Sequence, residues 1–268
     1  MPLKPPAPRY VADLFAPLHR ELMALLRGLT DEQWERPTVA GQWRVRDVAA
    51  HLLDGMLRKW SRGGTAVPVL SYDEVVTLLN DLNATGVAYW QRVSPGVLTD
   101  LLERAGAQVA ELVEQADPHA LANISVAWAG ETQSENWMDV GREYTEWWHH
   151  QMQIRDAVGA PALLVARWLA PLLDFSVRAL PRAYEPLDAP EGTTVSIYID
   201  GEPWSVRREG GSWALYEGAD DAPTTTIRLD ADTAWRLFYN APRGRAAAVV
   251  SGDATLAEPL FRTRSVMV

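Results

Sequence analysis

The chain has 268 residues, of which 47% are hydrophobic and 22% are charged. This length and composition suit a folded protein with two cores and exclude global disorder. The formal net charge of −10 disfavours a dedicated nucleic-acid binder, which needs basic residues to neutralise phosphates. The chain contains no cysteine, which excludes disulfides, thiolate metal ligands and a cysteine nucleophile. Any thiol chemistry would therefore need an external thiol.

The segments most relevant to localisation carry no targeting signal. The first ten residues, MPLKPPAPRY, lack the apolar core of a signal peptide. The longest apolar stretch, 165–173, is interrupted by Arg167 and Pro171 and is too short to span a bilayer. We therefore expect a cytoplasmic protein without a membrane partner, and either a monomer or a homodimer.

Apolar residues recur at helical spacing through the first two-thirds of the chain. The pattern predicts six helices, at 10–28, 45–61, 72–90, 96–115, 135–158 and 162–180. Gly28 and Gly159 stand at the ends of two of them, and Pro95 stands at the start of a third, as is typical of helix boundaries. Long amphipathic helices joined by short to moderate links predict a helical bundle.

The pattern changes after a linker at 186–192. Strands are predicted at 193–199, 204–208, 213–216 and 224–229, with Asp200 and Gly201 as a hairpin turn between the first two. Asp230 then caps a helix that runs to Phe238, and a last helical piece is expected near 255–261. The C-terminal part is therefore predicted to be a small α+β domain.

Two of the predicted helices carry candidate metal ligands. Glu146 and His150 are one turn apart, so both project from the same face of the fifth helix, beside its apolar arc. The neighbouring His149 projects well away from them, and we expect it to be exposed or to support the ligands from behind. His51 lies at the edge of the apolar arc of the second helix. If the two helices pack side by side, His51, Glu146 and His150 converge as three metal ligands.

The surroundings of His51 suit a catalytic site. Gly55, one turn on, would leave open space above the imidazole, and Asp47, one turn back, could orient the ring. Three protein ligands leave a coordination position for solvent or substrate, as catalytic metal sites do. Imidazole and carboxylate ligands suit zinc, nickel, iron or manganese.

The histidines and tryptophans also have plain structural interpretations. A histidine at a helix edge is often an ordinary core or surface residue, and a Glu-x-x-x-His pair often arises by chance. His19 is expected to be buried in the core, and His119, in a loop, to be solvated. The twelve tryptophans are expected to fill the core rather than to form a ligand box.

Several stretches resemble a known family. Residues 41–52, GQWRVRDVAAHL, and 144–156, YTEWWHHQMQIRD, are similar to the two ligand helices of DinB-like four-helix bundles, and specifically of mycothiol-dependent maleylpyruvate isomerases. Residues 226–238 and 252–257 resemble the sterol-carrier-like domain that often follows. The resemblance implies a DinB-like four-helix bundle with an additional helix over 8–183, and a small α+β domain over 190–268.

The same resemblance implies a function. It assigns His51, Glu146 and His150 as ligands of a divalent metal, with zinc as the usual ion and nickel as the alternative. It implies an external low-molecular-weight thiol, mycothiol or bacillithiol, and a small electrophilic substrate that is isomerised or receives the thiol. An arginine of the C-terminal domain would hold substrate carboxylates, and Arg236, Arg243 and Arg245 lie in that region.

Two non-catalytic interpretations stay open at this point. In one, the bundle is a structural or sensory metal module, and the C-terminal domain binds a small apolar ligand. In the other, the protein is a helical scaffold that binds no metal. The sequence assigns no catalytic residue beyond the three candidate ligands.

Overall fold

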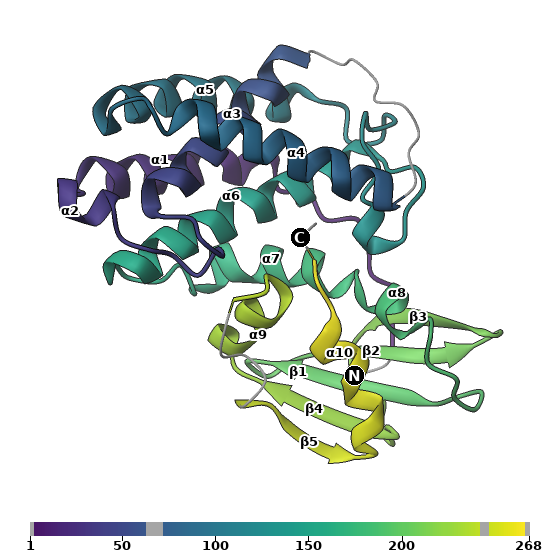
Figure 1. Cartoon of the computed structure of the whole chain (residues 1–268). Helices are drawn as coiled ribbons and strands as arrows, with labels where there is room; N and C mark the ends of the chain where they lie inside the picture. Colours follow the sequence, from purple (N-terminus) through teal and green to yellow (C-terminus); the bar gives the residue numbers. More distant parts are fainter. Residues whose placement is uncertain (1–2, 63–71, 242–246, 266–268) are drawn as a thin grey trace. The chain divides into compact units, whose positions relative to one another are not determined.

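The computed structural model describes residues 3–62, 72–241 and 247–265 (Figure 1). The chain forms two compact units, which are considered separately. The helical unit comprises Arg9–Val126 and Thr132–Leu163, and the sheet unit comprises the chain up to Pro8, Ala127–Glu131 and the chain from Leu164 onward. The helix expected at 162–180 thus lies in the sheet unit. The limits of 8–183 and 190–268 for independent domains stay a prediction.

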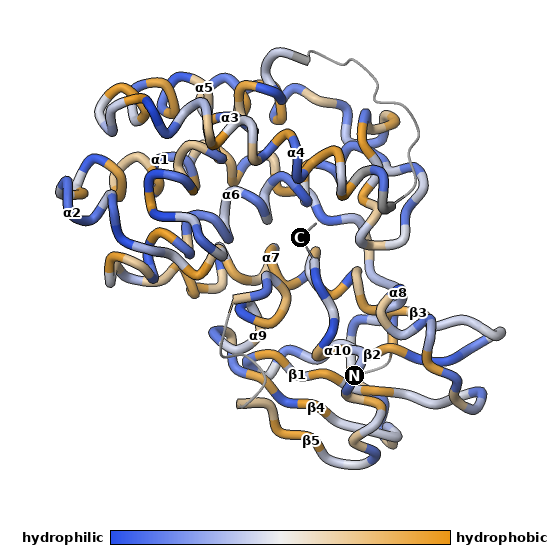
Figure 2. The backbone as a smooth tube through the Cα atoms, viewed as in Figure 1, coloured by the Kyte–Doolittle hydropathy of each residue, from blue (hydrophilic) through white to orange (hydrophobic). Residues whose placement is uncertain are grey.

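The helical unit is built around four long helices. Its elements are η1 (Ala12–Leu14), α1 (Phe15–Arg27), α2 (Asp31–Trp34), α3 (Val45–Arg62), α4 (Tyr72–Trp90), α5 (Pro95–Gln115) and α6 (Asn136–Val158). Helices α1 and α3 both pack against α5 and α6, and α4 packs on α3. This arrangement confirms the expected four-helix bundle with an additional helix. Figure 2 shows apolar and polar residues alternating along these helices, as expected for amphipathic segments.

Local sequence explains where these helices begin and end. Gly159 follows α6 with a φ of 71°, a left-handed conformation that glycine adopts without strain. Helix α2 was not among the predicted helices, and it forms because Thr30 and Gln33 make a capping box that closes one helical turn. Helix α6 is unusual because it is buried on nearly every side, polar residues included. It is therefore the central helix of the unit.

The sheet unit combines short helices with a five-stranded sheet. Its elements are η2 (Ala127–Ala129), α7 (Ala166–Val177), α8 (Leu180–Tyr184), β1 (Thr194–Ile199), β2 (Glu202–Glu209), β3 (Ser212–Glu217), β4 (Thr225–Leu229), α9 (Ala231–Phe238), β5 (Val249–Gly252), η4 (Ala254–Ala257) and α10 (Glu258–Arg262). The strand order is β3-β2-β1-β4-β5, and the β1–β4 pair is parallel. Asp200 and Gly201 both have positive φ, so the predicted two-residue hairpin turn is confirmed.

The sequence patterns missed two features of this unit. Strand β5 was not expected, because a four-residue edge strand is too short to show a clear alternation. The helix expected at 162–180 is shorter, α7 at Ala166–Val177, and the separate short helix α8 at Leu180–Tyr184 was not expected. The Ser176 and Tyr239 hydroxyls hydrogen-bond each other, and the Tyr184 hydroxyl donates to the Leu256 carbonyl, so both helices are held against the C-terminal part. Among the described helices, none combines the length and apolar character needed to cross a bilayer.

Candidate metal centre

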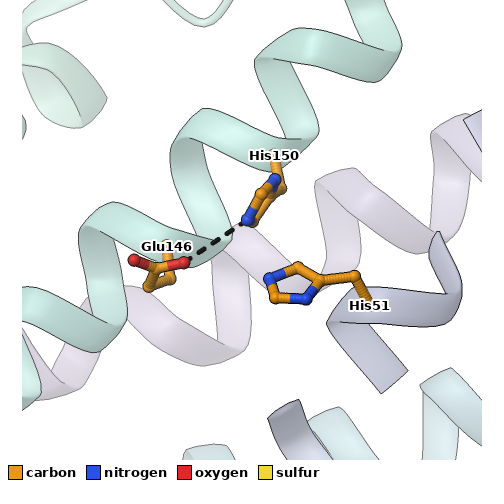
Figure 3. A group of neighbouring side chains, drawn as sticks. All are labelled: His51, Glu146 and His150. Carbon is orange, nitrogen blue, oxygen red and sulfur yellow. Dashed lines mark ion pairs between the residues drawn. The ribbon is translucent and has the colours of Figure 1, made fainter. Parts of the chain in front are cut away.

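His51, Glu146 and His150 come together inside the helical unit, as the sequence predicted. One potential ligand atom from each residue lies within 4.8 Å of the others. Figure 3 shows His51 projecting from α3 toward Glu146 and His150 on α6. The three side chains are mostly shielded from solvent: the histidines are buried and Glu146 is partly exposed. Nitrogen and oxygen donors at this separation are suited to one divalent ion.

Antiparallel packing of α3 on α6 explains why these residues meet. The rings of His51 and His150 lie 4.5 Å apart, and further along α3 Lys59 forms an ion pair with Asp139, which lies earlier on α6. Contacts therefore advance along α3 while they recede along α6. The apolar face of α3 is fully buried, which places His51 at the edge of the packed interface rather than in solvent.

Glu146 and His150 are paired directly. The distance between His150 Nε2 and a Glu146 carboxylate oxygen is 3.3 Å. On the other side of the ring, His150 Nδ1 donates to the Gln153 side-chain oxygen at 2.8 Å. This second bond selects the tautomer with a free lone pair on Nε2, which is the form that binds a metal. The sequence analysis did not identify this role of Gln153.

The His51 ring is held by stacking. It lies 5.0 Å from the Trp43 ring and in an edge-to-face arrangement with His150. Its Nδ1 is buried without a hydrogen-bond partner, so the prediction that Asp47 orients the ring is wrong. The Asp47 carboxylate instead accepts from the Arg44 backbone N–H and caps the start of α3. The space beside Gly55 is open, as expected, because an added Cβ would meet nothing within 4 Å.

Burial and charge favour the protonation states that a metal site needs. Burial lowers the pKa of His51 well below its usual value, and nearby His150 lowers it further. Burial alone would raise the pKa of Glu146, but the adjacent His150, His149 and Arg142 hold it well below its usual range. At neutral pH His51 is thus neutral and Glu146 is ionised.

A buried ion network continues from the triad along α6. Arg142 donates to Asp139 at 2.8 and 3.0 Å and to Glu143 at 3.0 Å. Lys59 reaches the other Asp139 oxygen at 2.6 Å. Burial alone would raise the pKa of Asp139, but Arg142 and Lys59 lower it to about 2. The network joins α3 to α6 close to the triad.

The positions of the remaining histidines can be compared with those expected from the sequence. The expectation that His149 projects away from the ligand pair and is exposed is wrong. Its ring lies 3.9 Å from the His150 ring and its Nδ1 bonds the Thr145 carbonyl, which leaves the alternative that His149 supports the ligands. It is only 2% exposed, because α6 is surrounded by other segments, and burial lowers its pKa to about 3. His19 is buried and bonds the Leu102 carbonyl, as expected. His119 is exposed, as expected, and bonds Tyr10 and Glu135.

The tryptophans and the candidate arginines can also be compared with the predictions from the sequence. Most described tryptophans are buried in the core, which confirms that interpretation, although Trp43 lies against the triad. In the sheet unit Arg236 bonds Asp232 and stacks over Trp235. Arg243 and Arg245 lie outside the described residues.

The triad fits a divalent metal. Zinc bonds to histidine nitrogen and carboxylate oxygen of about 2.0–2.2 Å imply tetrahedral donor separations of about 3.3 Å. The His150–Glu146 pair already has this separation, at 3.3 Å. The architecture is that of a DinB-like helical bundle, and its buried helix pair presents two imidazoles and one carboxylate that could hold one divalent ion.

Comparison with known proteins supports this class. The model of the mycothiol maleylpyruvate isomerase N-terminal domain matches residues 15–155, which is more than half of the chain, so the chain belongs to this enzyme family. A crystal structure of the mycothiol-dependent maleylpyruvate isomerase matches with a TM-score of 0.57 at 15% identity, covering 91% of this chain and 92% of that one. A histidine-to-alanine mutant of that isomerase matches with a TM-score of 0.56 at 14% identity over the same shares. No curated protein matches the chain.

Proposed function

We propose that this protein is a divalent-metal-dependent enzyme that uses a low-molecular-weight thiol to isomerise a small electrophilic substrate, or to transfer the thiol to it. The observation that carries the proposal is the convergence of His51, Glu146 and His150 within 4.8 Å in the family's N-terminal domain. Zinc is the proposed ion, with nickel as the alternative. Mycothiol is the proposed thiol, with bacillithiol as the alternative. The proposed location is the cytoplasm, as a monomer or homodimer.

The side chains in and around the triad are already arranged to bind a cation. The neutral His51 imidazole and the ionised Glu146 carboxylate can bind a cation without losing a proton at neutral pH. Gln153 holds the His150 ring, and Trp43 covers His51 on one side. When bound, a divalent metal supplies a positive charge that lowers the pKa of a nearby thiol.

The thiol must come from outside, because the chain has no cysteine. In the proposed isomerisation the thiolate adds to one carbon of a conjugated cis alkene, and the electron pair of the double bond moves into the adjoining carbonyl. Rotation about the new single bond follows. Elimination then breaks the carbon–sulfur bond, restores the double bond as trans and releases the thiolate. The proposed substrate is maleylpyruvate, after which the similar isomerase is named.

Metal content tests the triad. The protein, purified without a metal-chelating tag and dialysed against zinc or nickel, is expected to hold one ion per chain by elemental mass spectrometry. His51→Ala, Glu146→Gln and His150→Ala are each expected to lose it. Glu111→Gln, which changes an exposed carboxylate on α5, is the control and should keep it. Wild-type metal content in His51→Ala and His150→Ala would refute the triad.

Thiol binding and turnover test the rest. Calorimetric titration of the zinc-loaded protein with mycothiol, bacillithiol and glutathione should show one thiol that binds clearly tightest, and only when metal is present. With that thiol, the protein should convert maleylpyruvate to its trans isomer, followed by absorbance. Metal binding without affinity for any of the three thiols would instead favour a structural or sensory metal module.

A further inference from the structure

A second pocket lies in the helical unit. Its volume is about 220 Å³, and its walls come from the segment before α1, the end of α5 and the start of α6. Most of the lining is apolar and includes Val11, Ala116, Pro118 and Val140. Pockets for drug-sized ligands are about 300–1,000 Å³, so this one suits a smaller organic molecule.

The residues with polar groups in the pocket lining are Tyr10, Glu114, Asn136 and Trp137. Among the described lining residues, Glu114 carries the only charge, and it is negative. Tyr10 and Trp137 contribute aromatic rings to the lining. The Trp137 ring is fixed, because its Nε1 donates to the Glu135 carboxylate at 2.8 Å. Aromatic faces and a carboxylate are the groups that recognise an organic cation.

A chain of hydrogen bonds at the pocket sets the role of Tyr10. The oxygen of Glu135 that binds Trp137 also lies 3.2 Å from His119 Nδ1, and His119 Nε2 lies 3.1 Å from the Tyr10 hydroxyl. When the Glu135 oxygen accepts from Nδ1–H, the lone pair of this tautomer lies on Nε2. That lone pair accepts the Tyr10 hydroxyl proton. The Tyr10 oxygen is thereby left as an acceptor for a ligand N–H.

From these groups we infer that the pocket binds a small organic ammonium ion. The apolar body of the ligand fills the cavity, the Tyr10 oxygen and the Glu114 carboxylate accept its N–H groups, and the Tyr10 and Trp137 rings contact its positive charge. An anionic ligand would face a carboxylate without a compensating lysine or arginine among the lining residues. A neutral ligand would gain nothing from the Glu114 carboxylate, which is exposed and stays hydrated.

This site is separate from the metal centre. None of His51, Glu146 and His150 lines the pocket. Along α6, the lining residue Trp137 precedes Glu146 by more than two turns and is about 180° around the helix from it at about 100° per residue. The inference therefore does not depend on the proposed enzymatic function, and it can be tested on protein without metal.

Three matched probes test the ligand class. Para-fluorobenzylammonium, para-fluorobenzyl alcohol and para-fluorobenzoate share a ring and differ in charge. Fluorine NMR line broadening, measured on the full chain at pH 7.5, yields a dissociation constant for each. We expect saturable binding of the ammonium probe in the millimolar range or tighter. The alcohol should bind several-fold more weakly and the benzoate not detectably.

Substitutions locate the binding. Ala116→Leu fills the cavity and should abolish binding of the ammonium probe. Tyr10→Phe removes the acceptor but keeps the ring and should weaken binding about tenfold, as for a hydrogen bond to a charged group. Glu114→Gln should weaken it about threefold, as for a solvent-exposed ion pair. Asp100→Asn removes a carboxylate from the far end of α5 and should leave binding unchanged. Circular dichroism confirms that each variant is folded.

Each outcome of these experiments either supports or refutes the ammonium site. An ammonium preference that is lost in Ala116→Leu and weakened in Tyr10→Phe supports the inference. Equal binding of the alcohol, or stronger binding of the benzoate, overturns the assigned ligand class. If the ammonium probe does not bind at about 10 mM, which is about the weakest affinity that such contacts give, the site is refuted. Unchanged binding in Ala116→Leu also refutes the site.

Discussion

Replacing Gln153 by leucine removes the acceptor that holds the His150 ring. The Gln153 side-chain oxygen lies 2.8 Å from His150 Nδ1, and Gln153 is only 5% exposed, so water has little access to replace it. Without this acceptor the ring can rotate or change tautomer, and the Nε2 lone pair is no longer held toward Glu146. Loss of such a partner typically weakens metal binding about 10–100-fold. This range corresponds to about 1.4–2.7 kcal/mol of binding free energy.

The assay is zinc competition with a chromophoric chelator. Gln153→Leu is expected to raise the zinc dissociation constant by the factor given above, and Gln153→Glu, which keeps an acceptor, to restore tight binding. The control is Gln151→Leu, because Gln151 is also a buried amide of α6 but bonds the Leu18 carbonyl and Arg155 instead of the triad. If Gln153→Leu binds zinc as tightly as Gln151→Leu does, the proposed role of the His150 ring is refuted.

Three further perturbations test the packing and electrostatics of the helical unit. Lys59→Met leaves the buried Asp139 with one cation fewer and should lower the free energy of unfolding by about 1–2 kcal/mol in urea melts. Gly106→Ala places a Cβ on the His19 ring, where α1 and α5 approach closely, and should lower it by about 1–3 kcal/mol. The pKa of His149 falls from 6.5 to about 3 on folding, so the unfolded chain takes up a proton that the native state does not. Below pH 6.5 the metal-free protein should therefore lose about 1.4 kcal/mol of stability per pH unit from this residue, until the pH nears 3.

Each of these perturbations has a control or a refuting result. Gly55→Ala adds the same methyl group to α3 where it meets nothing within 4 Å, so stability should be unchanged or up to about 1 kcal/mol higher. His149→Gln should flatten the acid limb of the stability curve, and an unchanged slope would contradict the assigned burial effect. An unaltered urea midpoint in Lys59→Met would show that the ion pair with Asp139 is not stabilising.

Many elements were predictable because their signals are local. Helical spacing of apolar residues and the positions of Gly159 and Pro95 placed the long helices close to their observed bounds. Asp200 and Gly201 identified the hairpin, because aspartate tolerates positive φ and glycine, which lacks a Cβ, adopts it without strain. Strand β5 and helix α2 were missed because each is too short for periodicity, and their stability comes from neighbours or from a capping box.

The supporting residues of the site were less predictable. Asp47 is one turn from His51, which made it a plausible partner, yet its carboxylate caps the start of α3 at closer range. Gln153 was equally visible in the sequence, but an amide on a polar stripe has many conceivable partners. Which partner a flexible polar side chain takes depends on the positions of donors and acceptors around it, and these are set by packing.

The sequence by itself determined that Glu146 and His150 share one face of a helix, because residues four apart are neighbours in any α-helix. It also determined that His51 lies at the border of an apolar face. Only the tertiary structure brought His51 opposite the pair, since that required α3 to pack antiparallel on α6 with His51 and His150 side by side. It also buried His149, which phase alone suggested could be exposed. Helix phase is a property of one segment, whereas burial depends on how many other segments surround it.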